Sequence, residues 1–241
     1  EEVVRFMHFI NGFNQLFDNN ENETIRNKYT EIKEFLANKK EGDMDNRDIL
    51  TIKGLIRRGE ARTSCTFNQI PLSRCHFLDL PFYETGKIEK NPISEADIEI
   101  VLKLLREVQP HQIYVAGDLA DPHGTHRVCT DAVFAAIDEE KNAGAEWLND
   151  CRIWMYRGAW AEWEIENIEM AVPFSPEELR EKRNSILKHQ SQMESAPFLG
   201  NDERLFWQRS EDRNRGTASL YNQLGLACYE AMEAFVEYKP L

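Results

Sequence analysis

The densest group of side chains that could do chemistry lies in the loop 117–127, where two carboxylates and two imidazoles occur close together. Neutral imidazole is a preferred ligand of zinc, and a nearby carboxylate can fix the tautomer of a ligating or catalytic histidine. A His-x-x-His pair with neighbouring aspartates therefore suits metal-assisted hydrolysis. The four side chains are Asp118, Asp121, His123 and His126.

The same loop also has a structural interpretation. Asp121 or Thr125 can cap the helix that follows, while the histidines satisfy hydrogen bonds in the loop. A catalytic zinc generally needs three protein ligands and an open position for water, so two histidines require further ligands from elsewhere. The remaining histidines lie in predicted helices, in a predicted strand or among polar residues, where we expect structural or solvated roles: His8, His76, His111 and His189.

The elements around this loop predict an α/β fold. Apolar runs predict buried strands at 75–80, 113–116 and 153–156, and amphipathic spacing predicts helices at 98–108 and 125–142 between them. This βαβαβ order favours a Rossmann-like, doubly wound, mostly parallel sheet. Ligands of such sheets bind outside the carboxyl ends of the strands, which is where the loop 117–127 lies.

The rest of the chain predicts mainly helices. Amphipathic spacing predicts helices at 25–35 and 46–68, an edge strand at 168–172, a helix starting at Ser175-Pro176-Glu177-Glu178 and a long closing helix at 218–238. Helical spacing already begins at Val3 without a capping residue, as though the chain were cut within an element. We therefore expect one domain over 1–241 whose first strand is missing: a helical part at 1–70, a βαβαβ core at 71–174 and C-terminal helices at 175–241.

Composition excludes several classes of protein. The chain has 29 basic and 42 acidic residues and a formal charge of -13, which disfavours nucleic acid as a partner. It has neither an apolar run of about 18 residues nor a basic, cleavable leader, so no membrane partner and a cytoplasmic location are expected. The five cysteines contain no C-x-x-C pair and are expected to be buried thiols in a reducing compartment.

Three stretches resemble the LmbE-like (PIG-L) family of zinc-dependent N-deacetylases. The sequence His123-Gly124-Thr125-His126 is similar to the family's His-Pro-Asp-His signature, with Gly-Thr in place of Pro-Asp. Arg57-Arg58-Gly59-Glu60-Ala61 is similar to its Arg-x-x-Glu-Ala helix, and Phe77-Leu78-Asp79-Leu80-Pro81 to the strand that follows. Over nearly the whole chain, and most clearly through 80–87 and 116–126, the sequence resembles the C-terminal, deacetylase-like half of glucosamine-6-phosphate deaminase-like proteins.

The resemblance implies a zinc cofactor and roles for individual residues. His126 would be a zinc ligand, His123 would assist the transition state together with Asp121, and Arg57 and Asp118 would contact the substrate. The family's other motif, His-Pro-Asp-Asp, supplies two zinc ligands and the general base, and it does not occur in this chain. The remaining zinc ligands are therefore expected from a missing N-terminal segment, and this fragment alone is expected to be inactive.

The function expected from the resemblance is removal of acetyl from an N-acetylated amino sugar, either free or phosphorylated, beside a fused deaminase domain. The alternative is a non-catalytic sugar-binding or regulatory module attached to that deaminase. Trp160 follows the third predicted strand, so it could wall the pocket against a sugar ring, with Arg157 or Glu162 as a polar contact. The tryptophans could instead form a protein-interaction face or belong to the core.

Overall fold

The computed structural model describes residues 22–40, 43–83, 91–117, 124–158, 161–193, 202–225 and 228–239, together with Met7, Ile10 and Phe13. The chain divides into two compact units. Unit 1 comprises Glu1–Phe77 and Lys188–Gln192, and unit 2 comprises Leu78–Leu187 and Met193–Leu241.

Unit 1 is helical where it is described. Helices α2 (Asn22–Asn38) and α3 (Arg47–Phe67) confirm the two helices predicted in this region. The α3 helix begins at Asn46, whose side chain accepts a hydrogen bond of 3.0 Å from the Ile49 N–H, as an N-cap residue should. The buried apolar residues between these helices form a small core: Phe13, Ile32, Ile49 and Ile52.

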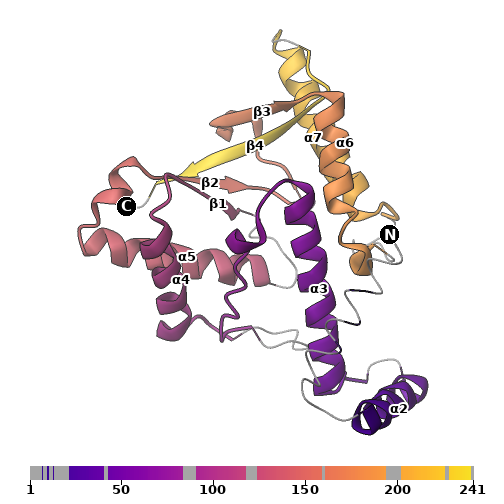
Figure 1. The fold of residues 1–241 in the computed structure, drawn as a ribbon. Coiled ribbons are helices and arrows are strands. Elements are labelled where there is room, and N and C mark those ends of the chain that lie inside the picture. The colour runs from indigo at the N-terminus through magenta and orange to yellow at the C-terminus, as the bar shows by residue number, and fades with distance from the viewer. Residues whose placement is uncertain are drawn as a thin grey trace. The chain divides into compact units, whose positions relative to one another are not determined.

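Unit 2 is built on a four-stranded mixed sheet of order β1-β2-β4-β3 (Figure 1). Strands β1 (Gln112–Ala116) and β2 (Arg152–Tyr156) are parallel, whereas β4 (Ala231–Tyr238) runs antiparallel to both β2 and β3 (Met170–Phe174). The prediction of a Rossmann-like, doubly wound, mostly parallel sheet is therefore wrong. The described residues form an α/β fold in which only one neighbouring pair of strands is parallel.

Two local errors explain the wrong sheet. Residues 75–80 form no strand, because Asp79 adopts φ 51°, which interrupts an extended backbone; Leu78 and Leu80 still pack against the core of this unit. The predicted helix at 218–238 is two elements. Helix α7 (Phe206–Gln223) ends just before Gly225, which has φ 81°, and the chain then returns as β4.

The other elements of unit 2 confirm the predictions. Helices α4 (Glu95–Val108), α5 (Thr125–Asn142) and α6 (Pro176–Ile186) lie where apolar spacing and capping residues indicated, and β3 is an edge strand. At the start of α6 the Glu178 N–H donates to the Ser175 hydroxyl at 3.2 Å, and the Ser175 N–H donates to the Glu178 carboxylate at 2.8 Å. This reciprocal pair is a capping box.

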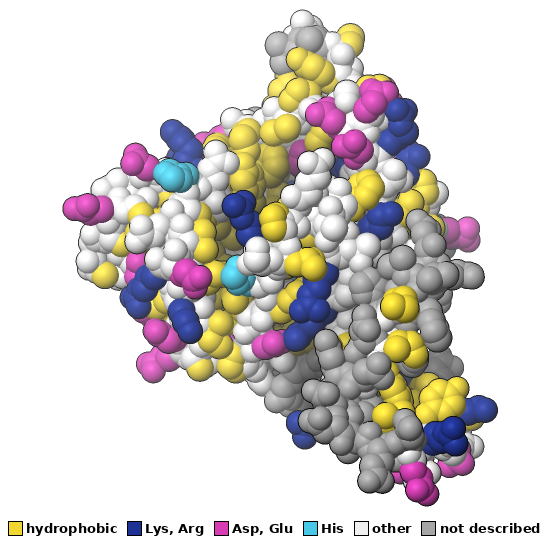
Figure 2. Space-filling view, in the orientation of Figure 1, with side chains coloured by type: hydrophobic (Ala, Val, Ile, Leu, Met, Phe, Trp, Pro, Cys, Tyr) yellow, Lys and Arg dark blue, Asp and Glu magenta, His cyan; other side chains and the backbone are white. Residues whose placement is uncertain are grey.

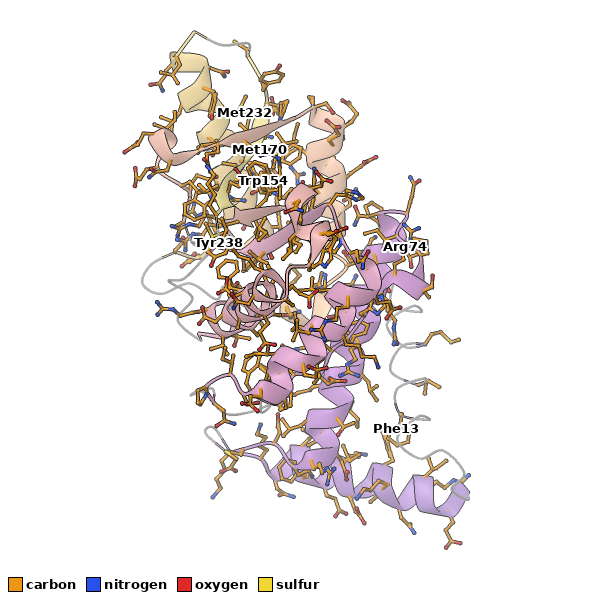
Figure 3. All side chains as sticks on the ribbon, turned by 90° about the vertical axis from the view of Figure 1, so that its left-hand side faces the viewer. Phe13, Arg74, Trp154, Met170, Met232 and Tyr238 are labelled. Atoms are coloured by element: carbon orange, nitrogen blue, oxygen red, sulfur yellow. The ribbon has the colours of Figure 1, made fainter. Side chains whose placement is uncertain are left out.

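An apolar core joins α4 and α5 to β1 and β2. Its buried members are Val101, Leu102, Leu105, Val115, Ala132, Ala136, Ile137 and Ile153. Tyr238 of β4, labelled in Figure 3, borders this core. Its ring stacks on that of Phe134 of α5, with the ring centroids 3.7 Å apart. This packing fixes the parallel pair of strands and the helix that connects them.

Two further expectations can be compared with the structure. No cysteine is fully buried: Cys129 and Cys228 are exposed and the other three are half-buried, so the prediction of buried thiols is wrong. Among the residues that the structure describes, no helix is both long enough and apolar enough to cross a membrane.

Candidate functional site

The candidate site lies at the carboxyl ends of β1 and β2, where the parallel pair is tied to α5. The Gly117 N–H, directly after β1, donates to the carbonyl of Tyr156 at 2.7 Å, which continues the parallel ladder. On the helix side, the Thr130 hydroxyl donates to the carbonyl of Ala116 at 2.7 Å. The first turns of α5 are therefore fixed against the end of β1.

His126 belongs to this anchored part of α5. It lies four residues before the buried Thr130, and residues spaced i, i+4 share one face of a helix. The residue is half-buried, with its Nδ1 atom shielded from solvent. Its position in the first turn of α5, beside the end of β1, is one from which a side chain can face a ligand at the carboxyl end of the sheet.

The backbone conformation at the start of α5 is one that the family's His-Pro-Asp-His signature could not adopt. Gly124 is the N-cap of α5 and has φ 66°. It occupies the place of proline in the His-Pro-Asp-His signature, and the ring of proline fixes φ near -65°. At position 124 this conformation is therefore accessible to glycine and closed to proline.

Trp163 closes this end of the sheet. Its indole N–H donates to the carbonyl of Met155 at 3.2 Å, and the guanidinium carbon of Arg157 lies 4.1 Å from the centroid of the ring. A Cβ atom added to Gly117 would lie 2.6 Å from Cζ2 of Trp163 and 2.9 Å from Cβ of Met155. Glycine at 117 is therefore required by the close approach of the indole ring.

A polar network supports the segment that carries Trp163. The Trp163 N–H donates to Glu162 at 2.9 Å, and the same carboxylate accepts from Arg213 at 3.0 Å and from the Thr217 hydroxyl at 2.9 Å. Arg213 is almost fully buried in α7 and also donates to Glu233 of β4. The loop after β2 is thus tied to the helix and strand that follow much later in the chain.

Glu233 is the centre of this network. It accepts hydrogen bonds from Lys182 of α6 and Arg213, and the amide of the fully buried Asn214 donates to it at 3.3 Å. Burial alone would raise the pKa of Glu233, but the charges of Arg213 and Lys182 outweigh burial and hold the pKa below its ordinary value. Burial, with a contribution from Glu233, raises the pKa of Tyr156 at the end of β2.

Unit 1 contains the other predicted contact residue. Arg57 is exposed on α3. Glu60 of the same Arg-x-x-Glu sequence is buried and accepts hydrogen bonds of 2.7 Å from both the N–H and the hydroxyl of Ser191. Glu60 therefore holds the segment Lys188–Gln192 against α3, which is a structural role that the sequence did not indicate.

Several predicted residues cannot be compared with the structure. Asp118, Asp121, His123 and Trp160 lie outside the described residues, so their roles and that of Arg57 stay predictions. Within the described ranges, no group of three or more His, Cys, Asp or Glu side chains could hold a metal ion. Those residues supply one imidazole at the strand ends, which does not by itself fit a catalytic zinc.

The sequence predicted that the segment 160–164 walls the pocket and named Trp160, not Trp163, as its contact residue. The polar network of Glu162, Arg213 and Glu233 could not have been predicted from the spacing of residues in the sequence. Glu162 and Arg213 lie 51 residues apart, and Arg213 and Glu233 lie 20 residues apart. The only available signal was the unusual density of tryptophan and charge after the strand at 153–156.

Comparison with known proteins gives one strong sequence match. The chain is 83% identical over all of its 241 residues to a protein of Bacteroides thetaiotaomicron described as "Putative glucosamine-6-phosphate deaminase-like protein". The chain spans 36% of that protein's length. No family model matches the chain.

Among solved structures, the chain is similar to the conserved protein TT1542 of Thermus thermophilus. The sequence identity is 15% and the TM-score is 0.48, over 83% of this chain and 77% of that one. The sequence match, and not this structural one, therefore provides the basis for inferring function.

Proposed function

We propose that this chain forms the N-deacetylase-type part of a larger amino-sugar-metabolising protein and contributes to removal of acetyl from an N-acetylated amino sugar. The observation that carries the proposal is the position of His126, in the first turn of α5 beside the carboxyl end of β1. The deaminase-like description of the 83% identical relative, and the 36% share of its length, support a fused deaminase region in the same polypeptide.

The proposed cofactor of the whole protein is zinc, with His126 as one ligand. A bound zinc would supply a water of lowered pKa and polarise the acetamide carbonyl. The described residues of this chain supply one imidazole toward such a site and do not complete it. Their own contribution is to hold the His126 imidazole on an anchored helix and to close the end of the sheet with Trp163.

The test measures acetate release from N-acetylglucosamine and its 6-phosphate by the full-length protein, with and without a chelator. We expect chelation to abolish release and His126→Ala to reduce it by about 100-fold or more, because loss of one ligand weakens a three-ligand site. His111→Ala is the matched control: His111 is exposed just before β1, at the opposite end of the strand. Release that persists in chelator would contradict the zinc mechanism.

A second candidate is a sugar-binding or regulatory module without hydrolysis. It is favoured by Gly124, whose φ of 66° gives the loop a backbone that the proline of the family signature could not adopt. Calorimetry separates the two functions. Sugar binding without acetate release, in protein supplemented with zinc, supports the module, whereas release that depends on His126 supports the deacetylase.

A further inference from the structure

Two cysteines of unit 1 lie close together at the turn where the chain leaves α3. Cys65 is in the last turn of this helix, and Cys75 lies in the segment that follows it. The chain reverses between them: Gln69 has φ 61°, and the Ile70 N–H donates to the carbonyl of Cys65 at 2.9 Å. The Cys75 thiol donates to the carbonyl of Pro71 at 3.6 Å. Both cysteines are therefore fixed against the same turn.

The two thiols also interact with each other. Burial raises the pKa of Cys65, and a hydrogen bond to Cys75 and the charge of a Cys75 thiolate raise it further. A hydrogen bond between two thiols requires their sulfur atoms to be neighbours. Both side chains are half-buried, so neither thiol is sealed from solvent. The turn after α3 therefore presents a pair of adjacent thiols that a small molecule can reach.

The charge around this thiol pair is positive, although the whole chain has a net charge of -13. Arg62 lies one turn before Cys65 on α3, and the exposed Arg74 directly precedes Cys75. The guanidinium carbon of Arg62 lies 5.1 Å from the centroid of the Phe77 ring, which places it beside the segment that carries Cys75. Figure 2 shows basic side chains gathered over α3. Positive charge stabilises a thiolate and attracts a reactant that carries carboxylates.

We propose that Cys65 and Cys75 are a site of reversible oxidation, at which a small disulfide such as oxidised glutathione converts the pair to an intramolecular disulfide. The Cys75 thiolate attacks one sulfur of the glutathione disulfide and the bond between its two sulfurs breaks. One glutathione leaves and takes up the proton that Cys75 has lost. Cys65 then attacks the sulfur of Cys75, and the second glutathione leaves with the proton of Cys65. Two protein thiols are oxidised, and one glutathione disulfide is reduced.

The disulfide would tie the last part of the N-terminal segment of unit 1 to α3. Unit 2 begins at Leu78, shortly after Cys75, so oxidation would restrain the segment through which the chain passes into unit 2. The inference is independent of the proposed function, because it uses no residue of the candidate site.

The test uses trypsin, because this protease separates the two cysteines. Cleavage after lysine and arginine places Cys65 in the peptide 63–74 and Cys75 in the peptide 75–87. The full-length protein is equilibrated with mixtures of reduced and oxidised glutathione, its remaining thiols are alkylated, and the digest is analysed by mass spectrometry. We expect the two peptides to be linked to each other without attached glutathione. The linked fraction should not depend on protein concentration, because the bond is intramolecular.

Cys151 is the matched control, since it is also half-buried. Burial raises the pKa of Cys151 as well, but no second thiol contributes there within the described residues. It should form only a mixed disulfide with glutathione. At about 1 mM reduced glutathione, the disulfide between Cys65 and Cys75 should be half formed at about 10-fold less oxidised glutathione than half modifies Cys151, because an intramolecular partner acts at an effective concentration in the mM range or above.

Three variants sharpen the assignment. Cys65→Ser and Cys75→Ser should each abolish the linked peptides and leave glutathione on the remaining cysteine of the pair. Cys151→Ser should leave the linked fraction unchanged. Far-ultraviolet circular dichroism identifies any variant that has failed to fold, and the digest of the wild-type protein decides the question without it.

Glutathione attached to Cys65 or Cys75 in the wild-type protein, without linked peptides, would overturn the inference. Linkage that requires as much oxidised glutathione as the modification of Cys151 would overturn it as well. The same holds if neither cysteine of the pair is modified at any ratio of oxidised to reduced glutathione.

Discussion

The two halves of the sheet in unit 2 are stabilised by different kinds of interaction. The parallel half, with α4 and α5, packs through aliphatic side chains such as Leu102 and Ile137, which are 1% exposed. The antiparallel half, with α6 and α7, adds to its buried apolar residues a network of Lys182, Arg213 and Glu233. Apolar packing tolerates small displacements, whereas buried charges require each partner to be in place.

The difference matters for the candidate site. His126 belongs to the parallel half, but Trp163 depends through Glu162 on Arg213 of the antiparallel half. The site is therefore anchored by the apolar core on one side and by the ionic network on the other. Substitutions in the two halves should accordingly differ in how much they change the free energy of unfolding, in how that change depends on pH, and in whether they disturb Trp163.

The largest effect is expected at the centre of the network. Glu233→Ala should lower the free energy of unfolding by about 4 kcal/mol, because it leaves the buried guanidinium of Arg213 and the half-buried ammonium of Lys182 without their shared carboxylate. Urea unfolding measures the change. Glu177→Ala, which removes an exposed i, i+3 pair with Arg180, is the control and should cost less than about 0.5 kcal/mol. A loss below about 1 kcal/mol for Glu233→Ala would show that the network is not a principal support.

The apolar half should respond less strongly to removal of one side chain. Leu102→Ala should cost about 3 kcal/mol, from lost transfer free energy and the cavity left beside Val101 and Leu105. The fluorescence of Trp163 should change in Glu233→Ala but not in Leu102→Ala, because only the former disturbs the residues that hold Glu162. Background from the other tryptophans is removed by repeating both substitutions in a Trp163→Phe variant.

Much of the parallel half could be predicted from the sequence, because its information is local. The spacing of Val101, Leu102 and Leu105 predicted α4, and the apolar run at 113–116 predicted β1. The antiparallel half could be predicted only in part: Ser175 with Glu178 indicated the start of α6, but β4 is defined by partners far away in sequence. Its segment 231–238 carries alanine, methionine and glutamate, which are good helix formers, and only pairing with β2 and β3 makes it a strand.

The candidate site divides in the same way. The loop 117–127 and His126 were visible as a cluster of residue types at a predicted strand end, and α5 begins where the sequence indicated. The supports of that site were not visible. Nothing in the spacing of Glu162, Arg213 and Glu233 relates them, because a buried ion pair leaves no periodic signal.

A smaller and pH-dependent effect is expected at Asp97 in the parallel half. This fully buried carboxylate accepts hydrogen bonds from the Ser94 N–H at 2.8 Å, the Ser94 hydroxyl at 2.6 Å and the Phe82 N–H at 2.8 Å. Burial alone would raise the pKa of Asp97, but these hydrogen bonds outweigh burial and lower it. Asp97→Asn should cost about 1–3 kcal/mol at pH 7, because the amide cannot accept all three.

The sign of the pH dependence follows from the lowered pKa of Asp97. A depressed folded-state pKa stabilises the protein above the unfolded value, near 3.9, and this contribution is lost as the pH falls through the folded value. The difference between wild type and Asp97→Asn should therefore shrink when urea unfolding is measured from pH 7 down to pH 3. A difference that stays constant across that range would show that the charge of Asp97 contributes nothing.

The smallest effect, and one of opposite sign, is expected in α7 of the antiparallel half. Gly216 lies within this helix, and a Cβ atom there would meet nothing within 4 Å, so Gly216→Ala should stabilise the protein by about 0.5–1 kcal/mol. Gly225→Ala is the matched control in the turn after the same helix, where φ of 81° should make alanine cost about 1–2 kcal/mol. In a Glu233→Ala background, a gain for Gly216→Ala that stays at or above about half of its wild-type value would mean that α7 still forms without the network. Loss of that gain would mean that α7 no longer forms once Glu233 is removed. The ionic network would then be required for the helix itself, as well as for the contacts of the helix with the sheet.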